Sequence, residues 1–256
     1  MIRLKDVTAG YNGFEIIKDI DLSFEKGSIT SIIGKNGCGK TTLLKVASNL
    51  LKPYRGDVIL NGVRISDLDR NKIAKQISFL PQVRSIPNIT VSSLVMHGRF
   101  PYLGFSRIPS KEDRAKVEEA MRKMGITKYK DKNLRELSGG ERQKVYIAMV
   151  LAQDTDVIFL DEPTTYLDIN HQLEILRIVK ELKDMGKTIV MVLHDLNSGL
   201  TYSDRICLME KGRIVIYDTP QAVFESKEID RVFDISSEQV YIKSKEEIQY
   251  VFSLSS

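Results

Sequence analysis

The fold is decided by the stretch ITSIIGKNGCGKTT, residues 29–42. Its first five residues are mostly apolar and are typical of a buried strand, whereas a helical pattern begins at Lys40. Residues 34–41 match Gly-x-x-x-x-Gly-Lys-Ser/Thr, a loop that joins a strand to a helix and cradles phosphate groups. A glycine-rich turn with a helix-capping threonine is the alternative, but the order strand, loop, helix favours a phosphate-binding loop in an α/β fold.

The residue types in this loop suit a nucleotide phosphate. Glycines let backbone N–H groups turn toward phosphate oxygens, and the following helix adds the positive end of its dipole. Lys40 can reach the outer phosphates, and the Thr41 hydroxyl can bind Mg²⁺. Cys38 is interpreted as a small filler and not as a redox sensor. The predicted nucleotide-binding residues of the loop are Gly34, Asn36, Gly37, Cys38, Gly39, Lys40, Thr41 and Thr42.

A second apolar run, Val157–Leu160, ends in the acids Asp161 and Glu162. In open parallel sheets ligands bind at the carboxyl ends of strands, and neighbouring strand residues point in opposite directions. The two acids can therefore take two roles. Asp161 can hold Mg²⁺ through its water shell, and Glu162 can orient and deprotonate a water that attacks the terminal phosphate. An acidic strand end that faces solvent is the alternative interpretation.

A third motif, Leu137–Gln143, opens a predicted helix that continues through Val145 and Met149. Ser138 and Glu141 have the spacing of a capping box, so a well-made helix start accounts for part of the pattern. Two consecutive glycines are poor helix formers, and their place in the first turn is explained if bare backbone amides approach an anion closely. The chain thus carries a second anion-binding turn beside the phosphate loop.

The composition excludes several classes of protein. The 256 residues, 42% of them hydrophobic and 28% charged, are typical of a soluble globular enzyme with a core and a smaller subdomain. A net charge of +4 gives no support for a nucleic-acid partner, and no apolar run approaches the length of a membrane span. Two distant cysteines and three histidines argue against a disulfide framework and a zinc site. We expect a cytoplasmic protein, because the first residues lack a secretory signal.

The pattern along the chain predicts strands, then a helical middle third, then strands again. Alternation of strand, helix and strand after residue 154 indicates a parallel sheet. Residues 221–256 give weak signals and no function is assigned to them. Hairpins are predicted at Asn61-Gly62 and Lys211-Gly212, and helical periodicity extends over about residues 90–152. The predicted strands are residues 2–8, 16–24, 29–33, 58–60, 77–80, 157–161 and 188–193.

With these motifs in this order, the chain resembles the ATP-binding cassette (ABC) ATPases over nearly its whole length. Tyr11 is similar to the aromatic residue that stacks on adenine, Gln82 to the Q-loop glutamine that also meets the metal, Asp168 to the D-loop aspartate, and His194 to the switch histidine. The resemblance implies a P-loop NTPase core with an antiparallel β subdomain and an inserted α-helical subdomain. The implied divisions are 1–81 and 154–220 for the core, 82–153 for the helical subdomain and 221–256 as a C-terminal segment.

The resemblance also implies how two copies work together. In a head-to-tail homodimer, Ser138, Gly139, Gly140, Glu141 and Asp168 of one copy contact ATP held by the phosphate loop of the other. Glu162, His194 and Lys40 would be the catalytic residues, with Mg²⁺ held by Thr41, Asp161 and Gln82. ATP and Mg²⁺ are the expected cofactors.

Three segments resemble the importer subclass that serves ferric siderophores, haem and cobalamin: His97–Phe105, Asp161–Ile169 with its unusual Tyr166, and His194–Asn197. This implies integral membrane permease subunits as partners, an extracytoplasmic substrate-binding protein that acts indirectly, and a peripheral location on the cytoplasmic face of the membrane. Residues 97–105 could also be an ordinary loop with proline and glycine. Import of molybdate or another metal chelate, and a soluble scaffold in iron–sulfur assembly or on a ribosome, remain alternative functions.

Overall fold

The computed structural model describes residues 1–82, 86–104, 107–165, 167–242 and 247–254. They form two compact units, of which the first comprises Met1–Asp67 and Val179–Ser256 and the second comprises Leu68–Ile178. Phe105 and Tyr166, which contribute to the resemblance, lie outside the described residues. Across the described ranges, every helix is too short or too polar to span a membrane.

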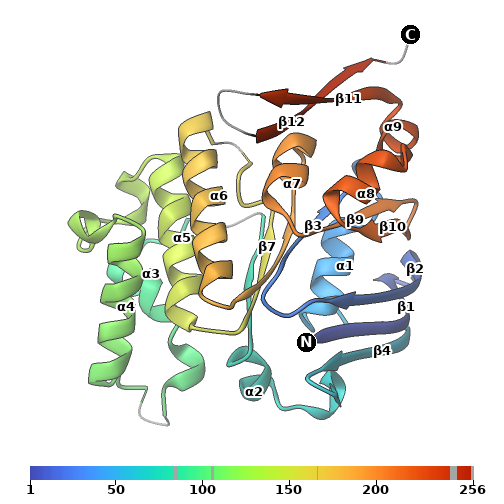
Figure 1. The fold of residues 1–256 in the computed structure, drawn as a ribbon. Helices are drawn as coiled ribbons and strands as arrows, with labels where there is room; N and C mark the ends of the chain where they lie inside the picture. Colours follow the sequence, from blue (N-terminus) through green and yellow to red (C-terminus); the bar gives the residue numbers. More distant parts are fainter. Residues whose placement is uncertain (83–85, 105–106, 166, 243–246, 255–256) are drawn as a thin grey trace. The chain divides into compact units, whose positions relative to one another are not determined.

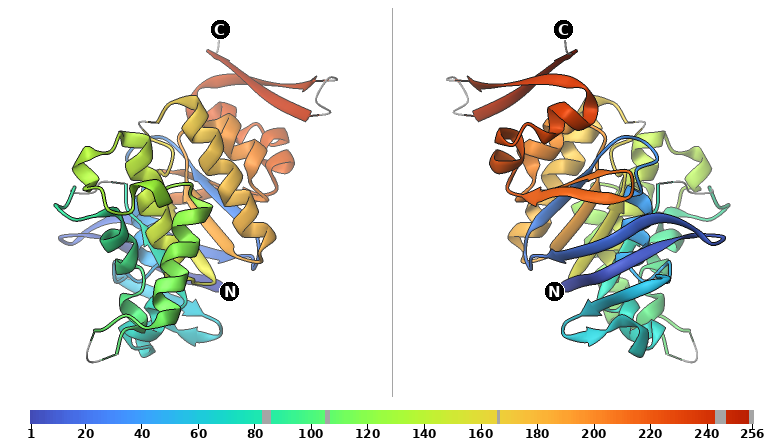
Figure 2. Two further views of the ribbon diagram at one scale, coloured as in Figure 1. Left: turned by 90° about the vertical axis from the view of Figure 1, so that its left-hand side faces the viewer. Right: turned by 90° about the vertical axis from the view of Figure 1, so that its right-hand side faces the viewer.

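The first unit contains an antiparallel sheet with the strand order β2-β1-β4-β5 (Figure 2). The predicted Asn61-Gly62 hairpin is confirmed, and both of its residues have positive φ, as a two-residue turn of matching twist requires. Alternating side chains of β1 are buried along its first half, so one face of the sheet packs inward. The strands are β1 (Ile2–Tyr11), β2 (Phe14–Phe24), β4 (Arg55–Leu60) and β5 (Val63–Arg64), and η1 (Ile65–Asp67) follows.

Parallel strands form the core of the first unit. β3 (Ile29–Ile33) lies between β8 (Thr188–Val192) and β9 (Arg205–Glu210) and is parallel to both. All five residues of β3 and of β8 are buried, which explains their nearly continuous apolar sequences. β10 (Arg213–Asp218) pairs antiparallel with β9 through the predicted Lys211-Gly212 hairpin. The predicted strand that leads into the phosphate loop is therefore confirmed.

The C-terminal residues complete the core of this unit. They form α8 (Pro220–Glu225), α9 (Glu228–Phe233) and a hairpin of β11 (Ile235–Ile242) and β12 (Glu247–Leu254), seen beside α7 (Leu196–Tyr202) in Figure 1. Buried apolar side chains of α8 and α9 form one hydrophobic cluster with side chains of β3, α7 and β9: Val223, Phe224, Ile229 and Val232 with Ile33, Leu200, Ile206 and Leu208. Burial of this apolar surface is the main source of their stability.

The second unit combines a pair of parallel strands with packed helices. β6 (Ile77–Leu80) pairs with β7 (Val157–Asp161) in parallel register. Three helices pack against one another in the predicted helical region, α3 (Val91–His97), α4 (Lys111–Lys123) and α5 (Gly139–Gln153). The remaining elements are α2 (Arg70–Ala74), η2 (Phe100–Tyr102), η3 (Thr127–Tyr129), η4 (Leu134–Glu136) and the start of α6 (Ile169–Asp184), a helix that crosses the unit boundary.

A buried ion pair fastens these helices together. Arg99 Nε donates to Asp113 Oδ1 at 2.9 Å, and Arg99 Nη1 donates to the carbonyl of Ala152 at 2.8 Å. The guanidinium also lies 3.8 Å from the centre of the Tyr102 ring. Arg99 thus ties the end of α3 to the first turn of α4 and the last turn of α5. Arg99, which belongs to the His97–Phe105 segment, therefore has a structural role in this fold.

The predicted fold class is confirmed, because the chain has a mixed α/β core with an antiparallel β portion and a helical part. The predicted division at residues 81/82, 153/154 and 220/221 separates segments by role, and it stays a prediction. The structure itself adds that the described residues of this segment, 221–242 and 247–254, are built into the first unit.

Candidate functional site

The phosphate loop lies in the first unit, between β3 and α1 (Lys40–Ala47). Gly34 and Gly39 have φ of +151° and +104°, values that L side chains rarely adopt. A Cβ at Gly34 would lie 2.3 Å from the carbonyl oxygen of Met209, so only glycine fits there. Lys40 is buried, and its Nζ donates to the carbonyls of Gly34 at 2.7 Å and of Lys35 at 3.1 Å. The loop therefore wraps around the ammonium group that would meet the outer phosphates.

Two other predicted residues, Tyr11 and His194, belong to the same unit as this loop. β3 and β8 are parallel neighbours with Ile32 opposite Val192, so Gly34 and His194 emerge at the same edge of the sheet. His194 is exposed and immediately precedes Asp195, the N-cap of α7. Tyr11, at the end of β1, is 41% exposed, which leaves its ring accessible for stacking.

Cys38 is buried within the loop, and burial raises the pKa of its thiol above the ordinary value. A raised pKa leaves little thiolate at neutral pH, and the thiolate is the reactive form. This environment agrees with the interpretation of Cys38 as a filler. Cys207 on β9 is likewise buried, and burial raises its pKa to about 12.

The second unit brings Gln82 and Glu162 together. β6 and β7 are in register with Leu80 opposite Leu160, so both side chains follow the carboxyl ends of neighbouring strands. Gln82 Nε2 donates a short hydrogen bond to Glu162 Oε2, and Thr165 Oγ1 donates to the same oxygen at 3.0 Å. Glu162 has φ of +52°, an unusual value for a residue with a side chain, and such strain is typical of functional sites.

A cavity of about 220 Å³ lies in front of this carboxylate within the second unit. Gln82, Glu162 and Gly139, three residues predicted from the sequence, line it together. Asp161 is 1% exposed at the end of β7, and Glu162 is 8% exposed, so the two acids differ from a solvent-facing strand end. The burial of Asp161 and Glu162 therefore favours the site interpretation over the surface interpretation.

Two residues that were not predicted from the sequence, Thr165 and Gln143, fix Glu162 and the loop that follows it. Thr165 donates to Glu162, and Gln143 Nε2 donates to the carbonyl of Pro163 at 2.6 Å. Gln143 lies in the first turns of α5 and is buried, so the loop after Glu162 is fixed to α5, the helix that begins in the Leu137–Gln143 motif. A signal was present, because Thr165 stands three residues after Glu162 and Gln143 ends the Leu137–Gln143 motif.

The first turn of α5, residues 138–141, is called the signature turn here, and it has the predicted capping box. Ser138 Oγ accepts from the backbone N–H of Glu141 at 3.3 Å, and Glu141 Oε2 accepts from the backbone N–H of Ser138 at 2.8 Å. Because its oxygen accepts a backbone N–H, the Ser138 hydroxyl keeps its proton to donate to an anion. A Cβ at Gly139 would meet nothing within 4 Å, so a phosphate group has open access to this backbone.

Glu141 will titrate far below an ordinary glutamate. A hydrogen bond from Tyr129, followed by those from Ser138, lowers its pKa from 4.5 to about 2. Because the folded-state pKa is lowered, the stabilisation is complete above pH 4.5 and is lost as the pH falls toward 2. Tyr129→Phe should move the pKa of Glu141 up toward 4.5 in a carboxyl-carbon NMR titration. Tyr241→Phe, on the exposed C-terminal hairpin, is the matched control, and a wild-type titration near 4.5 would contradict the assignment.

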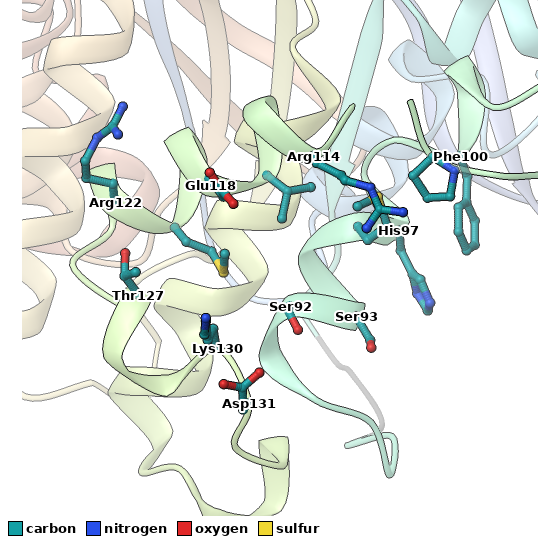
Figure 3. A pocket seen from close by; sticks show the side chains of 14 residues that line it. Ser92, Ser93, His97, Phe100, Arg114, Glu118, Arg122, Thr127, Lys130 and Asp131 are labelled. Carbon is teal, nitrogen blue, oxygen red and sulfur yellow. The ribbon is translucent and has the colours of Figure 1, made fainter. Parts of the chain in front are cut away.

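A larger cavity of about 720 Å³ lies between α3, α4 and η3 (Figure 3). Met96, Val117 and Met121 provide apolar surface, and side chains of both charges line the rest. Phe100 stacks on His97 with ring centroids 4.5 Å apart, and burial lowers the pKa of His97. None of the predicted site residues lines this cavity.

The predicted site residues thus fall into two groups, each described within its own unit. The first unit holds Tyr11, the phosphate loop and His194. The second unit holds Gln82, Asp161, Glu162, the signature turn 138–141 and Asp168, which accepts the backbone N–H of His171 at 2.9 Å. Their assignment to one nucleotide site stays a prediction.

Residues 17–165 match the family model described as ABC transporter. The chain is 43% identical over 234 residues to the iron(3+)-hydroxamate import ATP-binding protein FhuC of Bacillus subtilis (strain 168), covering 90% of this chain and 87% of that protein. It is 39% identical over 236 residues to the ferric enterobactin transport ATP-binding protein FepC of Escherichia coli (strain K12), covering 91% and 87%. The dimeric ATP-binding cassette MJ0796 with ADP and phosphate has a TM-score of 0.76 at 30% identity, covering 86% of this chain and 99% of that one.

Proposed function

Because the chain belongs to the ABC transporter family of ATP-binding proteins, we propose that it is the ATP-hydrolysing subunit of an importer. Its cargo would be a ferric siderophore, haem or cobalamin. The observation that carries the cargo class is the identity of 43% and 39%, over about nine-tenths of the chain, to proteins named for iron(3+)-hydroxamate import and for ferric enterobactin transport. The ATPase assignment rests on the family and on the motifs that carry the resemblance.

The working form would be a homodimer docked on integral membrane permease subunits at the cytoplasmic face. The dimeric cassette with ADP and phosphate, 30% identical to this chain, supports a two-copy arrangement. Ser138, Gly139, Gly140, Glu141 and Asp168 of one copy would close over the nucleotide of the other. An extracytoplasmic binding protein would deliver the cargo to the permease and meet this chain only indirectly.

Hydrolysis would proceed by in-line attack of water on the γ-phosphate. Glu162, held in place by Gln82 and Thr165, would take the proton from that water. Lys40 would place its ammonium on the outer phosphate oxygens, and His194 would hydrogen-bond the γ-phosphate. The bond between the β-phosphate oxygen and the γ-phosphorus would break as the water oxygen bonds to that phosphorus, giving ADP and inorganic phosphate. Departure of the phosphate would remove the γ-phosphate contacts that join the two copies, and the dimer would open.

Mg²⁺ would be held by Thr41, Asp161 and Gln82, whose side chains offer the oxygen donors that this ion prefers. This ion takes few protein ligands and keeps several waters, so a hydroxyl, a carboxylate and an amide oxygen suffice beside the phosphates. Asp161 is an acidic residue whose side chain is buried, with 1% of the residue exposed. A cation beside such a carboxylate strongly favours its ionised form, because little water is present to do so. When bound, Mg²⁺ neutralises the charge that develops on the phosphate oxygens.

The test is capture of the tagged chain from gently solubilised membranes of its own source, with mass spectrometry of the proteins that copurify. We expect a polytopic permease. Its companion binding protein would then be titrated with iron chelates, haem, cobalamin and molybdate, and tight binding of an iron chelate, haem or cobalamin is the expected result. Recovery of assembly factors or ribosomal proteins alone would contradict the importer, and selective binding of molybdate would contradict the cargo class.

A further inference from the structure

His171 joins two loops of the second unit that are predicted to meet one nucleotide. It stands in the first turn of α6, and its backbone N–H donates to Asp168 Oδ1 at 2.9 Å. Its ring Nδ1 lies 2.9 Å from both carboxylate oxygens of Asp168. A carboxylate only accepts hydrogen bonds, so Nδ1 carries the proton and donates it. Asp168 is therefore held by two groups of one residue.

The other side of the histidine ring faces the signature turn. A Cβ built on Gly140 would lie 3.0 Å from three carbon atoms of the imidazole, Cγ, Cδ2 and Cε1. This distance is shorter than ordinary van der Waals contact, so the ring packs directly on the bare Cα of Gly140. Gly139 shows no such neighbour within 4 Å. The second glycine of the motif is thus the one that admits His171.

These contacts make a continuous bridge from Asp168 through the imidazole to Gly140. The bridge lies at the protein surface, because the side chains of Asp168 and His171 are 63% and 32% exposed. The backbone N–H of His171, and then its ring, lower the pKa of Asp168, so the carboxylate stays ionised and the hydrogen bonds stay charge-assisted at neutral pH.

We propose that His171 is a positioning residue that fixes Asp168 and the signature turn to each other, so that both meet the nucleotide held by a second copy in one rigid arrangement. This inference rests on the proposed ATP-driven homodimer. Reacting groups must be held within about 0.5 Å of their productive positions, and a bridge of two hydrogen bonds and one close packing contact supplies that rigidity. His171 matches no motif in the sequence, and its role comes from its place between Asp168 and Gly140.

Two conservative variants separate positioning from direct contact. Asparagine places an amide nitrogen near the position of Nδ1, so His171→Asn can still donate to Asp168. Glutamine places its amide nitrogen near the position of Nε2. His171→Gln would therefore preserve only a direct contact of Nε2 with the nucleotide, if one exists, and not the hydrogen bond to Asp168. His171→Ala removes both. Asn170→Ala is the matched control, because the neighbouring Asn170 is an exposed residue of the same turn.

Each variant is measured for ATP binding by the monomer, for ATP hydrolysis, and for ATP-induced dimer mass in the Glu162→Gln background. We expect His171→Ala to raise the ATP concentration for half-maximal hydrolysis and dimerisation about tenfold, since small misplacements cost up to about a hundredfold. Monomer ATP binding should stay within about twofold, because the phosphate loop lies in the other unit. His171→Asn should recover most of the loss.

Hydrolysis and dimerisation by His171→Ala within about twofold of wild type would overturn the proposal. So would recovery by His171→Gln without recovery by His171→Asn, which would assign direct ligand contact instead. If His171→Ala does not fold, the comparison of the Asn and Gln variants decides the question. A wild-type chain that neither dimerises with ATP nor hydrolyses it would contradict the proposed function, which is a different outcome.

Discussion

Glu162→Gln should lower ATP hydrolysis by about a thousandfold or more, while ATP binding is retained and the ATP-bound dimer accumulates. Removing a general base costs about 10²- to 10⁴-fold in rate. Glutamine has nearly the shape of glutamate, and its amide oxygen can still accept the hydrogen bonds that Gln82 and Thr165 donate to Glu162. The variant therefore removes the proton acceptor without removing the geometry. Phosphate release and dimer mass by light scattering measure the two effects.

Glu118→Gln is the matched control, because Glu118 is an exposed carboxylate on α4 that lines the larger cavity. It should hydrolyse ATP at the wild-type rate. If Glu162→Gln retains more than about a tenth of the wild-type rate, Glu162 is not the base.

Arg99→Ala should destabilise the second unit by about 3–5 kcal/mol. This is the usual cost of removing one partner of a buried ion pair, because the other charge stays buried without compensation. Asp113 is 5% exposed and would keep only its hydrogen bonds with Ser110, and the carbonyl of Ala152 would lose its donor. The pKa of Asp113, which burial tends to raise, is held below its ordinary value by Ser110 and then by Arg99. The variant should therefore raise that pKa.

Unfolding in denaturant, monitored by hydrogen exchange of the backbone amides in α4 and α5, measures this loss of stability. A local probe is needed because a chain of two units need not unfold in one step. The control is Arg114→Ala, an exposed arginine of α4, which should change stability by less than about 0.5 kcal/mol. A loss below about 1 kcal/mol for Arg99→Ala would show that the ion pair does not hold the helices together.

Local patterns predicted the parts of this protein that depend on neighbours in sequence. The phosphate loop is one continuous segment, so the strand before Gly34 and the helix from Lys40 were both visible in the order of residue types. The capping box of Ser138 and Glu141 depends on a spacing of three residues, and it formed as expected. Glu162 could be predicted as a site residue because it directly follows an apolar strand that ends in a second acid, Asp161.

Contacts between distant segments could not be predicted in the same way. Arg99 reaches Asp113 and Ala152, and nothing in the local sequence distinguishes its buried guanidinium from that of an exposed arginine. His171 is defined by its contact with Gly140, which depends on how α5 and α6 pack. The C-terminal hairpin gave weak signals because much of its surface is exposed, so its strands lack a clear apolar alternation.

In the proposed function, ATP hydrolysis by this chain drives uptake of an iron complex. The direct test is uptake of a radioactive ferric siderophore by cells of the source that carry either the wild-type chain or Glu162→Gln as their only copy. We expect ATP-dependent accumulation with the wild-type chain and its loss with the variant, although both proteins reach the membrane. Equal accumulation in the two strains would contradict it.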